Sequence, residues 1–432
     1  MTTPLGQALT LPCGLVLPNR IVKSAVSEYL AESDGKVLTD HVALYQRWAE
    51  GGAGALITGN VMVDRRYPEA PGNIIIDPAD GLKVRDDLKR LSDAVRQGPA
   101  RIIMQVNHAG RQCPSVCCER PVAPSAVPMK FGRGGFLSFA PPRALTEDEI
   151  EDIIGRFVHA ISIAQTSGFD GVQIQAAHGF LISQFLSPRT NLRTDKWGGT
   201  LENRSRILME IFRRAREITG NEFAIGVKLN AADFQRGGLT FEDVLELVGW
   251  LHTERVDFIE ISGGNYEQPQ MFGVDGESHV YSDGRLKASI VAEEAYFAEY
   301  ASAIRDVSTI PVIASGGFRS REAMEMSIDF RRADAIGLAR PLCIDPYAPK
   351  DLISEQLADL HHIAPPESGL SAHVFGAKSP FPWVRALHRY ANITWYAYQV
   401  SKLAKMGRAA PNEGLISTLL AQRGFFKTHK KS

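Results

Sequence analysis

The sequence predicts an α/β protein: a (β/α)8 TIM barrel with long βα loops and a helical C-terminal extension. Three observations support this fold class. Short apolar runs rich in β-branched residues recur eight times, amphipathic stretches of helical period separate them, and the chain of 432 residues exceeds the roughly 250 that such a barrel needs. A hydrophobic content of 44% supplies a sizeable core and excludes a largely disordered chain.

The apolar runs are interpreted as strands buried on both faces, because most are nearly continuous rather than alternating. They span Arg20–Ser24, Ala55–Val63, Arg101–Asn107, Gly171–Ala177, Ala224–Leu229, Asp257–Ser262, Ile310–Ser315 and Ala335–Leu338. Serial βα units favour parallel strands with right-handed crossovers. An open doubly wound sheet would share this pattern, but no G-x-G-x-x-G motif follows the first run, so the closed barrel is favoured.

The predicted helices between these strands carry start signals. Thr146 and Glu149 fit a capping box, and Thr240 and Ser320 stand where caps are needed. The helical stretches are Asp40–Glu50, Leu82–Gln97, Glu147–Thr166, Ser205–Thr219, Phe241–Glu254, Ile290–Val307 and Arg321–Arg332. Each covers one crossover between consecutive strands.

Three βα connections are far longer than ordinary loops: residues 109–145, 178–204 and 263–289. In a barrel they would all crowd the C-terminal rim, where active sites lie. We expect residues 1–346 to form the barrel and residues 347–432, which are rich in aromatic side chains, to form a helical extension packed on it.

The charge balance gives no electrostatic reason to expect nucleic acid or an anionic membrane as partner. Lys and Arg number 48 against 49 for Asp and Glu, a formal net charge of −1. No stretch approaches the roughly 18 consecutive apolar residues of a spanning helix, and the first residues lack a signal-peptide layout. We therefore expect a cytoplasmic protein acting on a small molecule, and a homo-oligomer is compatible with the sequence.

The cysteines are few and odd in number, which suits a reducing compartment rather than a disulfide framework. Cys113, Cys117 and Cys118 are the only close group of the five. They lack a second pair or nearby His ligands, so loop thiols are favoured over a zinc site and no metal is expected.

Two glycine-containing strand ends indicate a phosphate site. The seventh strand ends in Ala314-Ser-Gly-Gly317 and the eighth in Gly337-Leu-Ala-Arg340. Loops after these two strands hold phosphate in many barrels, where glycines admit backbone N–H groups and an Arg supplies a forked charge. The alternative is two tight turns and a surface Arg.

Further polar residues cluster after the third and fourth strands. Gln105 precedes His108-Ala-Gly-Arg111, and its amide suits a heterocycle with adjacent C=O and N–H groups, although a satisfied buried amide is the simpler interpretation. Residues 175–204 form a long stretch with polar residues at specific places.

In this stretch the chain resembles the Old Yellow Enzyme family, the FMN-dependent NADH:flavin oxidoreductases. The resemblance covers residues 1–346. It includes Asn19-Arg20-Ile21-Val22, His108-Ala-Gly-Arg111, both phosphate elements and, most specifically, the Leu-Ser-Pro-x-x-Asn-x-Arg-Thr-Asp-x-x-Gly-Gly-x-x-Glu-Asn-Arg motif at residues 186–204.

The resemblance implies a (β/α)8 barrel with FMN across its C-terminal mouth. The flavin would be contacted by Ala25, Val26, Ser27, Gly59, Asn60, Gln105 and Lys228, and its phosphate by Ser315, Gly316, Gly317, Ala339 and Arg340. Ser27 would lie near N5 and O4, and Lys228 would face N1 and O2, where a fixed cation stabilises a reduced flavin. The alternative for Lys228 is a structural ion pair with Asp233.

The departures from the family pattern fall on its catalytic residues. Gln175 occupies the place of the usual first His of the carbonyl clamp, and His178 that of the second clamp residue. Phe180 occupies the place of the usual proton-donor Tyr, and a phenyl ring has no proton to give. Tyr29 and Tyr266 are the nearest replacements in the sequence, and solvent is a third source.

The leading hypothesis is an FMN oxidoreductase that takes hydride from NAD(P)H and passes it to an electrophilic acceptor such as an activated alkene or quinone. The alternative is a flavin-dependent dehydrogenase or isomerase of a specialised metabolite, suggested by the substitutions at Gln175 and Phe180. A third hypothesis is a flavin-binding barrel without turnover.

Overall fold

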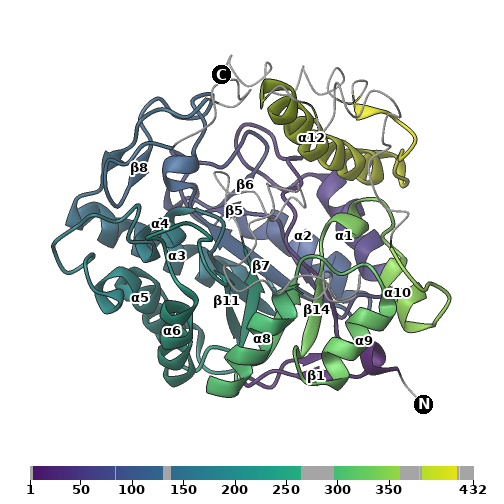
Figure 1. Cartoon of the computed structure of the whole chain (residues 1–432). Coiled ribbons are helices and arrows are strands. Elements are labelled where there is room, and N and C mark those ends of the chain that lie inside the picture. Colours follow the sequence, from purple (N-terminus) through teal and green to yellow (C-terminus); the bar gives the residue numbers. More distant parts are fainter. Residues whose placement is uncertain are drawn as a thin grey trace.

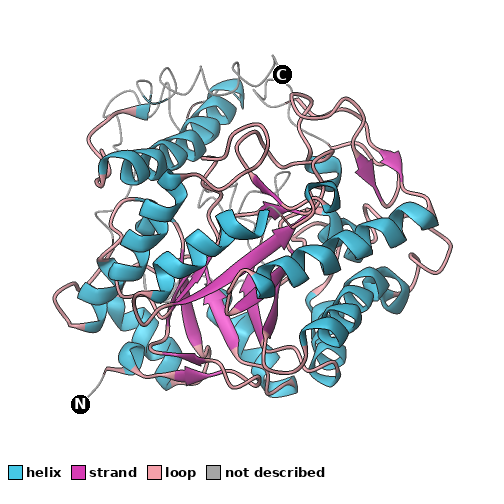
Figure 2. Cartoon of the chain, turned by 180° about the vertical axis from the view of Figure 1, so that it is seen from behind, coloured by secondary structure: helices cyan, strands magenta, loops and turns pink. Residues whose placement is uncertain are grey.

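A computed structural model of the chain describes residues 3–82, 84–129, 138–263, 296–360, 379, 382–415 and 418. Parallel strands form a closed barrel, which Figures 1 and 2 show from opposite sides. In chain order they are β3 (Ile21–Lys23), β4 (Ala55–Ile57), β7 (Arg101–Asn107), β10 (Gly171–Ala176), β11 (Ala224–Asn230), β12 (Phe258–Ser262), β13 (Val312–Ser315) and β14 (Ala335–Leu338). The ring closes where β10 pairs with β7. The predicted fold class is confirmed.

Helices cover the outside of the barrel, mostly where the sequence predicted them (Figure 1). They are α1 (Thr39–Glu50), α2 (Val84–Arg96), α3 (Glu147–Thr166), α5 (Leu201–Thr219), α6 (Phe241–Thr253), α8 (Tyr296–Val307) and α9 (Arg321–Asp329). The capping box of Thr146 and Glu149 is confirmed, and Thr240 and Ser320 both cap. α5 begins before the predicted Ser205, because Thr200 accepts the Asn203 amide and caps it.

The predicted second strand is in fact two. β4 ends at Ile57, and β5 (Val61–Met62) continues the pairing along β7. Between them the Gly59 amide donates to Glu28 Oε1 at 2.9 Å, so a side chain replaces the neighbouring strand as its partner. A Cβ on Gly59 would lie 2.3 Å from Glu28 Oε2, so the close approach of the two chains requires glycine.

An antiparallel hairpin outside the predicted strands fills the N-terminal end of the barrel. It consists of β1 (Leu9–Thr10) and β2 (Val16–Leu17). Its leucines pack against the inward-facing apolar side chains of the barrel strands, which are Val22, Ala55, Ile57, Ile103, Ala224, Phe258, Ile313 and Ala335. This end is a packed core, so polar chemistry is confined to the opposite end.

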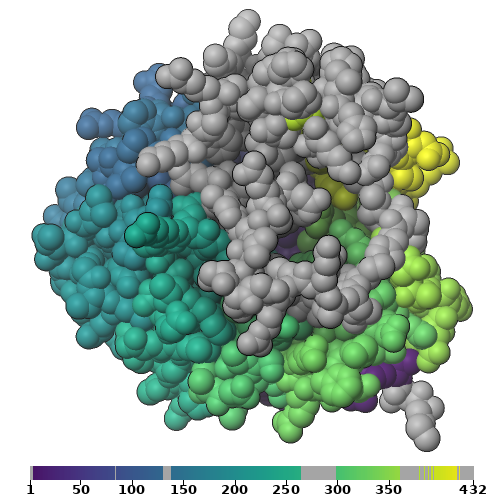
Figure 3. Space-filling view, in the orientation of Figure 1, coloured from purple at the N-terminus to yellow at the C-terminus, as the bar shows by residue number. Residues whose placement is uncertain are grey.

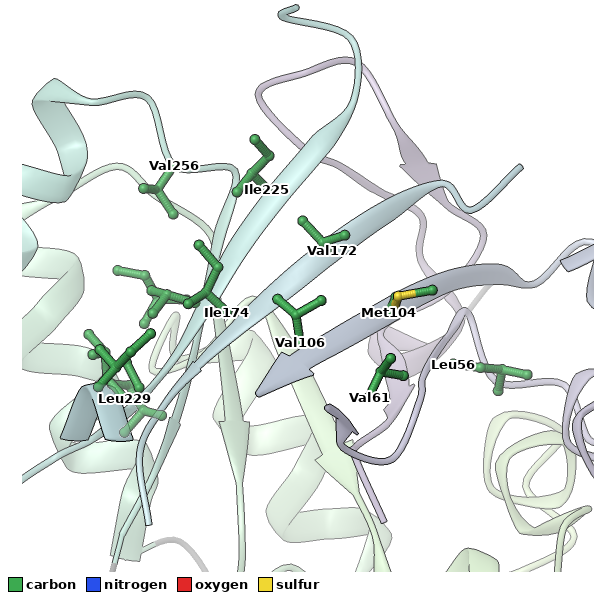
Figure 4. Close-up of a cluster of buried hydrophobic side chains, with 14 of the residues drawn as sticks. Leu56, Val61, Met104, Val106, Val172, Ile174, Ile225, Leu229 and Val256 are labelled. Carbon is green, nitrogen blue, oxygen red and sulfur yellow. The ribbon is translucent and has the colours of Figure 1, made fainter. Parts of the chain in front are cut away.

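The outward faces of the strands carry the main core, which the helices cover. Figure 4 shows Met104 and Val106 of β7 beside Val172 and Ile174 of β10. The intervening residue Gln105 points into the barrel instead, where it meets other inward side chains. Successive side chains of a strand point to opposite faces. One nearly continuous apolar run therefore contributes side chains both to the interior of the barrel and to the main core between the strands and the helices.

One helix of the C-terminal part of the chain packs on the barrel. α12 (Pro382–Met406) lies along α1 in Figure 1, where Arg47 Nη1 donates to the Ala404 carbonyl at 3.3 Å. Val400 and Leu403 are buried in the main core. In the space-filling view the yellow residues of the extension lie above the green residues of the last barrel units (Figure 3). No helix within the described ranges has both the length and the hydropathy to cross a bilayer.

Candidate active site

A layer of polar side chains fills the barrel above the apolar end. Gln105, Gln173, Lys228, Glu260 and Ser315 all point inward and are almost fully buried. The strand register places Gln173 opposite Gln105 and Lys228 opposite Glu260. Hydrogen bonds join them: Gln105 Nε2 to Gln173 Oε1 at 2.5 Å, Gln173 Nε2 to Glu260 Oε2 at 2.8 Å, and Ser315 Oγ to Glu260 Oε1 at 2.6 Å.

Glu260 is the centre of this layer. Burial opposes its ionisation, but Lys228, with Nζ 2.9 Å from Glu260 Oε1, and hydrogen bonds from Ser315 and Gln173 lower the pKa of Glu260 to about 2. The sequence alternative of a Lys228–Asp233 pair is wrong, since Asp233 accepts from Ser187 and the Leu239 amide instead. Lys228 is thus a fixed, buried cation with a single carboxylate partner among the described residues.

The two residues of the expected clamp lie at the end of β10. Gln175 Nε2 donates to Gln105 Oε1 at 3.3 Å, and Gln175 Oε1 accepts the Ala177 amide. His178 has a φ of 61°, and its amide donates to Asn230 Oδ1. Its Nε2 lies 3.1 Å from Ser262 Oγ. Burial, reinforced by the nearby Lys228, lowers the pKa of His178 to about 3, so the imidazole is neutral at physiological pH.

The segment after β3 forms another side of the mouth. Ala25, Val26 and Ser27 are half-buried there. Ser27 Oγ donates to Glu69 Oε2 at 2.9 Å, and Asn60 Nδ2 donates to the same oxygen at 2.7 Å. Ser27 and Asn60, which the sequence places on successive strand ends, are therefore brought together by a carboxylate that sequence reasoning missed.

The ends of β13 and β14 carry the predicted phosphate elements. Gly316 and Gly317 are exposed and have positive φ values of 111° and 88°. Ala339 and Arg340 are half-buried beside them. Ser315 differs from the expectation in one respect: its hydroxyl bonds Glu260 and lies 2.8 Å from Ser24 Oγ, so only its backbone faces the glycine turn.

A second arginine accompanies Arg340. Arg319 follows the glycine turn. Burial raises the pKa of Tyr396 on α12, and the positive charges of Arg340 and Arg319 oppose that rise. Two cations thus gather where the last two barrel strands end. The Gly-Gly-Phe-Arg319 sequence was the signal that could have identified the second one.

The predicted substrate-pocket residues and the cysteines differ from one another in how deeply they are buried. Phe180 is only 3% exposed and packs in a small cluster with Met62, Ile75, Ala109 and Cys113. Tyr29 is half-buried next to Ser27 and Glu69. Tyr266 lies outside the described residues. Cys113, Cys117 and Cys118 are free thiols, and burial raises the pKa of Cys117 to about 12.

Comparison with known proteins decides the family. The model of the NADH:flavin oxidoreductase / NADH oxidase family matches residues 13–359. The chain belongs to this family. It is 34% identical over 428 residues to the NADH-dependent flavin oxidoreductase iccE of Talaromyces variabilis, covering 94% of this chain and 99% of that one. It is 37% identical over 363 residues to the NADH-dependent flavin oxidoreductase nadA of Aspergillus parasiticus, covering 81% and 79%.

Solved structures agree with this assignment. A 2-naphthoyl-CoA reductase complex matches with a TM-score of 0.71 at 26% identity, covering 82% of this chain and 52% of that one. The Old Yellow Enzyme homologue of Zymomonas mobilis matches in fold with a TM-score of 0.68 at 23% identity, covering 88% and 98%. The chain is an Old Yellow Enzyme-type NADH:flavin oxidoreductase that uses FMN.

The mouth of this oxidoreductase fits FMN on its own geometry. Asn60 Oδ1 is buried and has no hydrogen-bond partner in the described part of the chain, which leaves an acceptor for a ligand. The glycine backbone at residues 316 and 317 is exposed beside two arginines, the donor set that a phosphate requires. Lys228 supplies a cation below the mouth.

Proposed function

We propose that this oxidoreductase holds FMN across the C-terminal mouth with the residues that the sequence singled out. The flavin ring would rest on Ala25, Val26, Ser27, Gly59, Asn60, Gln105 and Lys228, and the phosphate on Ser315, Gly316, Gly317, Ala339 and Arg340. The observation that supports this proposal is the polar layer, in which Lys228 Nζ and Ser315 Oγ both bond Glu260 Oε1, and Ser315 lies one residue before the glycine turn that follows β13. These residues would hold the FMN, which would supply hydride chemistry between NAD(P)H and an electrophilic acceptor.

Gln175 and His178 would polarise the oxygen of that acceptor, an activated alkene, quinone or similar compound. Each contributes a neutral donor, because an amide does not ionise and His178 is buried beside Lys228. Two neutral donors orient a carbonyl and stabilise negative charge developing on its oxygen without first protonating it. Tyr29 and Phe180 would line the substrate side of the mouth.

An anaerobic titration tests this proposal. Purified protein should bind FMN, lose its yellow colour with NADH or NADPH, and then reduce 2-cyclohexenone or menadione. Lys228→Met should weaken reduction by NADH, and Arg340→Ala should weaken FMN binding. Protein that stays colourless after FMN is added would refute the proposal. Bleaching by a saturated substrate without pyridine nucleotide would indicate the dehydrogenase or isomerase alternative instead.

We also propose a cytoplasmic location, which the free cysteines among the described residues support, and a division between barrel and extension near residue 346. Fluorescence imaging of the tagged chain and limited proteolysis test the two statements separately.

A further inference from the structure

The usual source of the substrate proton is missing from this oxidoreductase. Phe180 occupies that place, is 3% exposed, and packs against the apolar side chains of Met62 and Ile75. Reduction of an alkene still requires a proton on the carbon next to the activating group. A positioned acid accelerates such steps by roughly 10²–10⁴-fold, so a second donor at the mouth would matter.

A buried carboxylate lies at the mouth next to a tyrosine. Four side chains among the described residues donate to Glu69: Asn60 Nδ2 at 2.7 Å, Ser27 Oγ at 2.9 Å, Tyr29 Oη at 3.1 Å and Asn73 Nδ2 at 3.4 Å. Burial raises the pKa of Glu69 above its usual range, against the hydrogen bonds that lower it. The carboxyl group thus lies within hydrogen-bond distance of a hydroxyl group with which it can exchange a proton.

Tyr29 is placed to use that proton. It is half-buried, only two residues from Ser27, and its φ of 53° is in the left-handed region, which side chains other than glycine seldom adopt. Such strain persists only where the surroundings hold the residue in place, here through the hydrogen bond to Glu69. In the structure the Tyr29 hydroxyl donates to Glu69 Oε1. When Glu69 carries a proton, the same contact runs from the carboxyl group to the Tyr29 oxygen, and the Tyr29 O–H is left to donate to a substrate.

We propose that Tyr29 is the proton donor to the acceptor carbon and that Glu69 positions Tyr29 and restores its proton. This inference rests on the proposed function, which supplies the hydride. As the hydride adds to the β-carbon, the Tyr29 O–H bond breaks and a C–H bond forms at the α-carbon. The carboxyl proton of Glu69 then moves to the Tyr29 oxygen, and the Glu69 carboxylate regains a proton from solvent.

The chain provides a matched control. Tyr45 also donates its hydroxyl to a glutamate, Glu28, but this pair is fully buried between β3 and α1. Tyr45→Phe removes the equivalent tyrosine–glutamate hydrogen bond in the buried core, together with the one that the Tyr45 oxygen accepts from the Gly59 amide at 3.2 Å. Any effect common to Tyr29→Phe and Tyr45→Phe is therefore structural.

The kinetic test uses the FMN-loaded enzyme after anaerobic reduction by NADH. We expect Tyr29→Phe to slow consumption of 2-cyclohexenone by roughly 100-fold and Glu69→Gln by roughly 10-fold. Consumption of menadione, whose reduction depends less on that proton, should stay within about two-fold in both variants. Tyr45→Phe should leave the ratio of the two rates unchanged.

Infrared spectroscopy supplies a readout that does not depend on turnover. At neutral pH the difference between wild type and Glu69→Gln should contain the C=O band of a protonated carboxyl group. This band should shift in Tyr29→Phe and stay in place in Tyr45→Phe. Its absence would overturn the role of Glu69.

Failure of the proposed function and failure of the Tyr29–Glu69 proposal would give different results. If wild-type enzyme consumes neither acceptor, the proposed function fails, while the infrared band still reports on the Tyr29–Glu69 pair. If wild type consumes both acceptors and Tyr29→Phe consumes 2-cyclohexenone at the wild-type rate, only the present inference is overturned.

Discussion

At the scale of single residues, several titratable side chains of this protein are buried and have shifted pKa values. Lys23 of β3 is fully buried between the strand and α1. Its Nζ donates to the Ile57 carbonyl at 2.8 Å and lies 4.2 Å from the Trp48 ring centroid. A carbonyl and an aromatic face compensate only part of the lost hydration. Burial therefore lowers the pKa of Lys23 to about 8.

This shift predicts a pH dependence of stability. Between pH 8 and 10.5 the unfolded chain keeps a proton that the folded chain has lost, so the free energy of unfolding rises with pH in this window. Relative to Lys23→Met, wild type should gain about 3 kcal/mol across it. Urea denaturation of both proteins at the two ends of the window checks this. A constant difference between them would contradict it.

The lowered pKa of His178 predicts that the protein loses stability at acidic pH. Its folded pKa of about 3 lies below the ordinary histidine pKa of 6.5, so the unfolded chain binds an extra proton between these values and the free energy of unfolding falls as the pH drops. Relative to His178→Asn, wild type should lose about 2 kcal/mol between pH 6.5 and 5. Denaturation midpoints at both pH values measure the loss. An equal loss in the variant would show that His178 is not the responsible group.

At the scale of elements, the segment between β4 and β5 is the most constrained part of the mouth. A Cβ on Gly59 would meet Val26 O at 2.5 Å as well as the Glu28 carboxylate. Backbone atoms at this distance cannot move aside without shifting the β3 loop that carries Ser27.

Gly59→Ala should therefore cost about 1–3 kcal/mol of stability and weaken FMN binding together. Thermal denaturation with and without FMN, combined with a fluorescence titration of the cofactor, measures both. Gly98→Ala is the control, since its nearest neighbour would be Val95 O at 3.8 Å. Unchanged FMN affinity in Gly59→Ala would mean that the loop does not contact the cofactor.

At the scale of the whole molecule, the extension and the barrel share one core. Leu403 of α12 is 1% exposed and belongs to the same cluster as the side chains around α1, whereas Met406 one turn further is 58% exposed. A substitution that destabilises α12 should therefore destabilise the barrel as well.

Leu403→Ala should lower the free energy of unfolding by about 2–5 kcal/mol, and Met406→Ala should change it by less than about 0.5 kcal/mol. Circular dichroism reports the whole chain and flavin release reports the barrel. If the extension of Leu403→Ala melts first and flavin release is unchanged, the shared core is not cooperative.

The sequence predicted the barrel, most helix boundaries and the family, because apolar periodicity, caps and the motif at residues 186–204 are local properties of the chain. It also placed Gln175, His178 and the glycine turns on strand ends. It missed Glu69, Glu260 and Gln173, and it assigned Lys228 the wrong alternative partner.

Those partners depend on tertiary contacts, since strand register and loop packing bring together residues that are distant in the chain. Glu260 meets Lys228 across β11 and β12, and Glu69 reaches Ser27 and Tyr29 from another loop. Whether a buried carboxyl group is ionised or holds a proton depends on these neighbours, because burial and nearby charge set its pKa. No local pattern in the sequence contains that information.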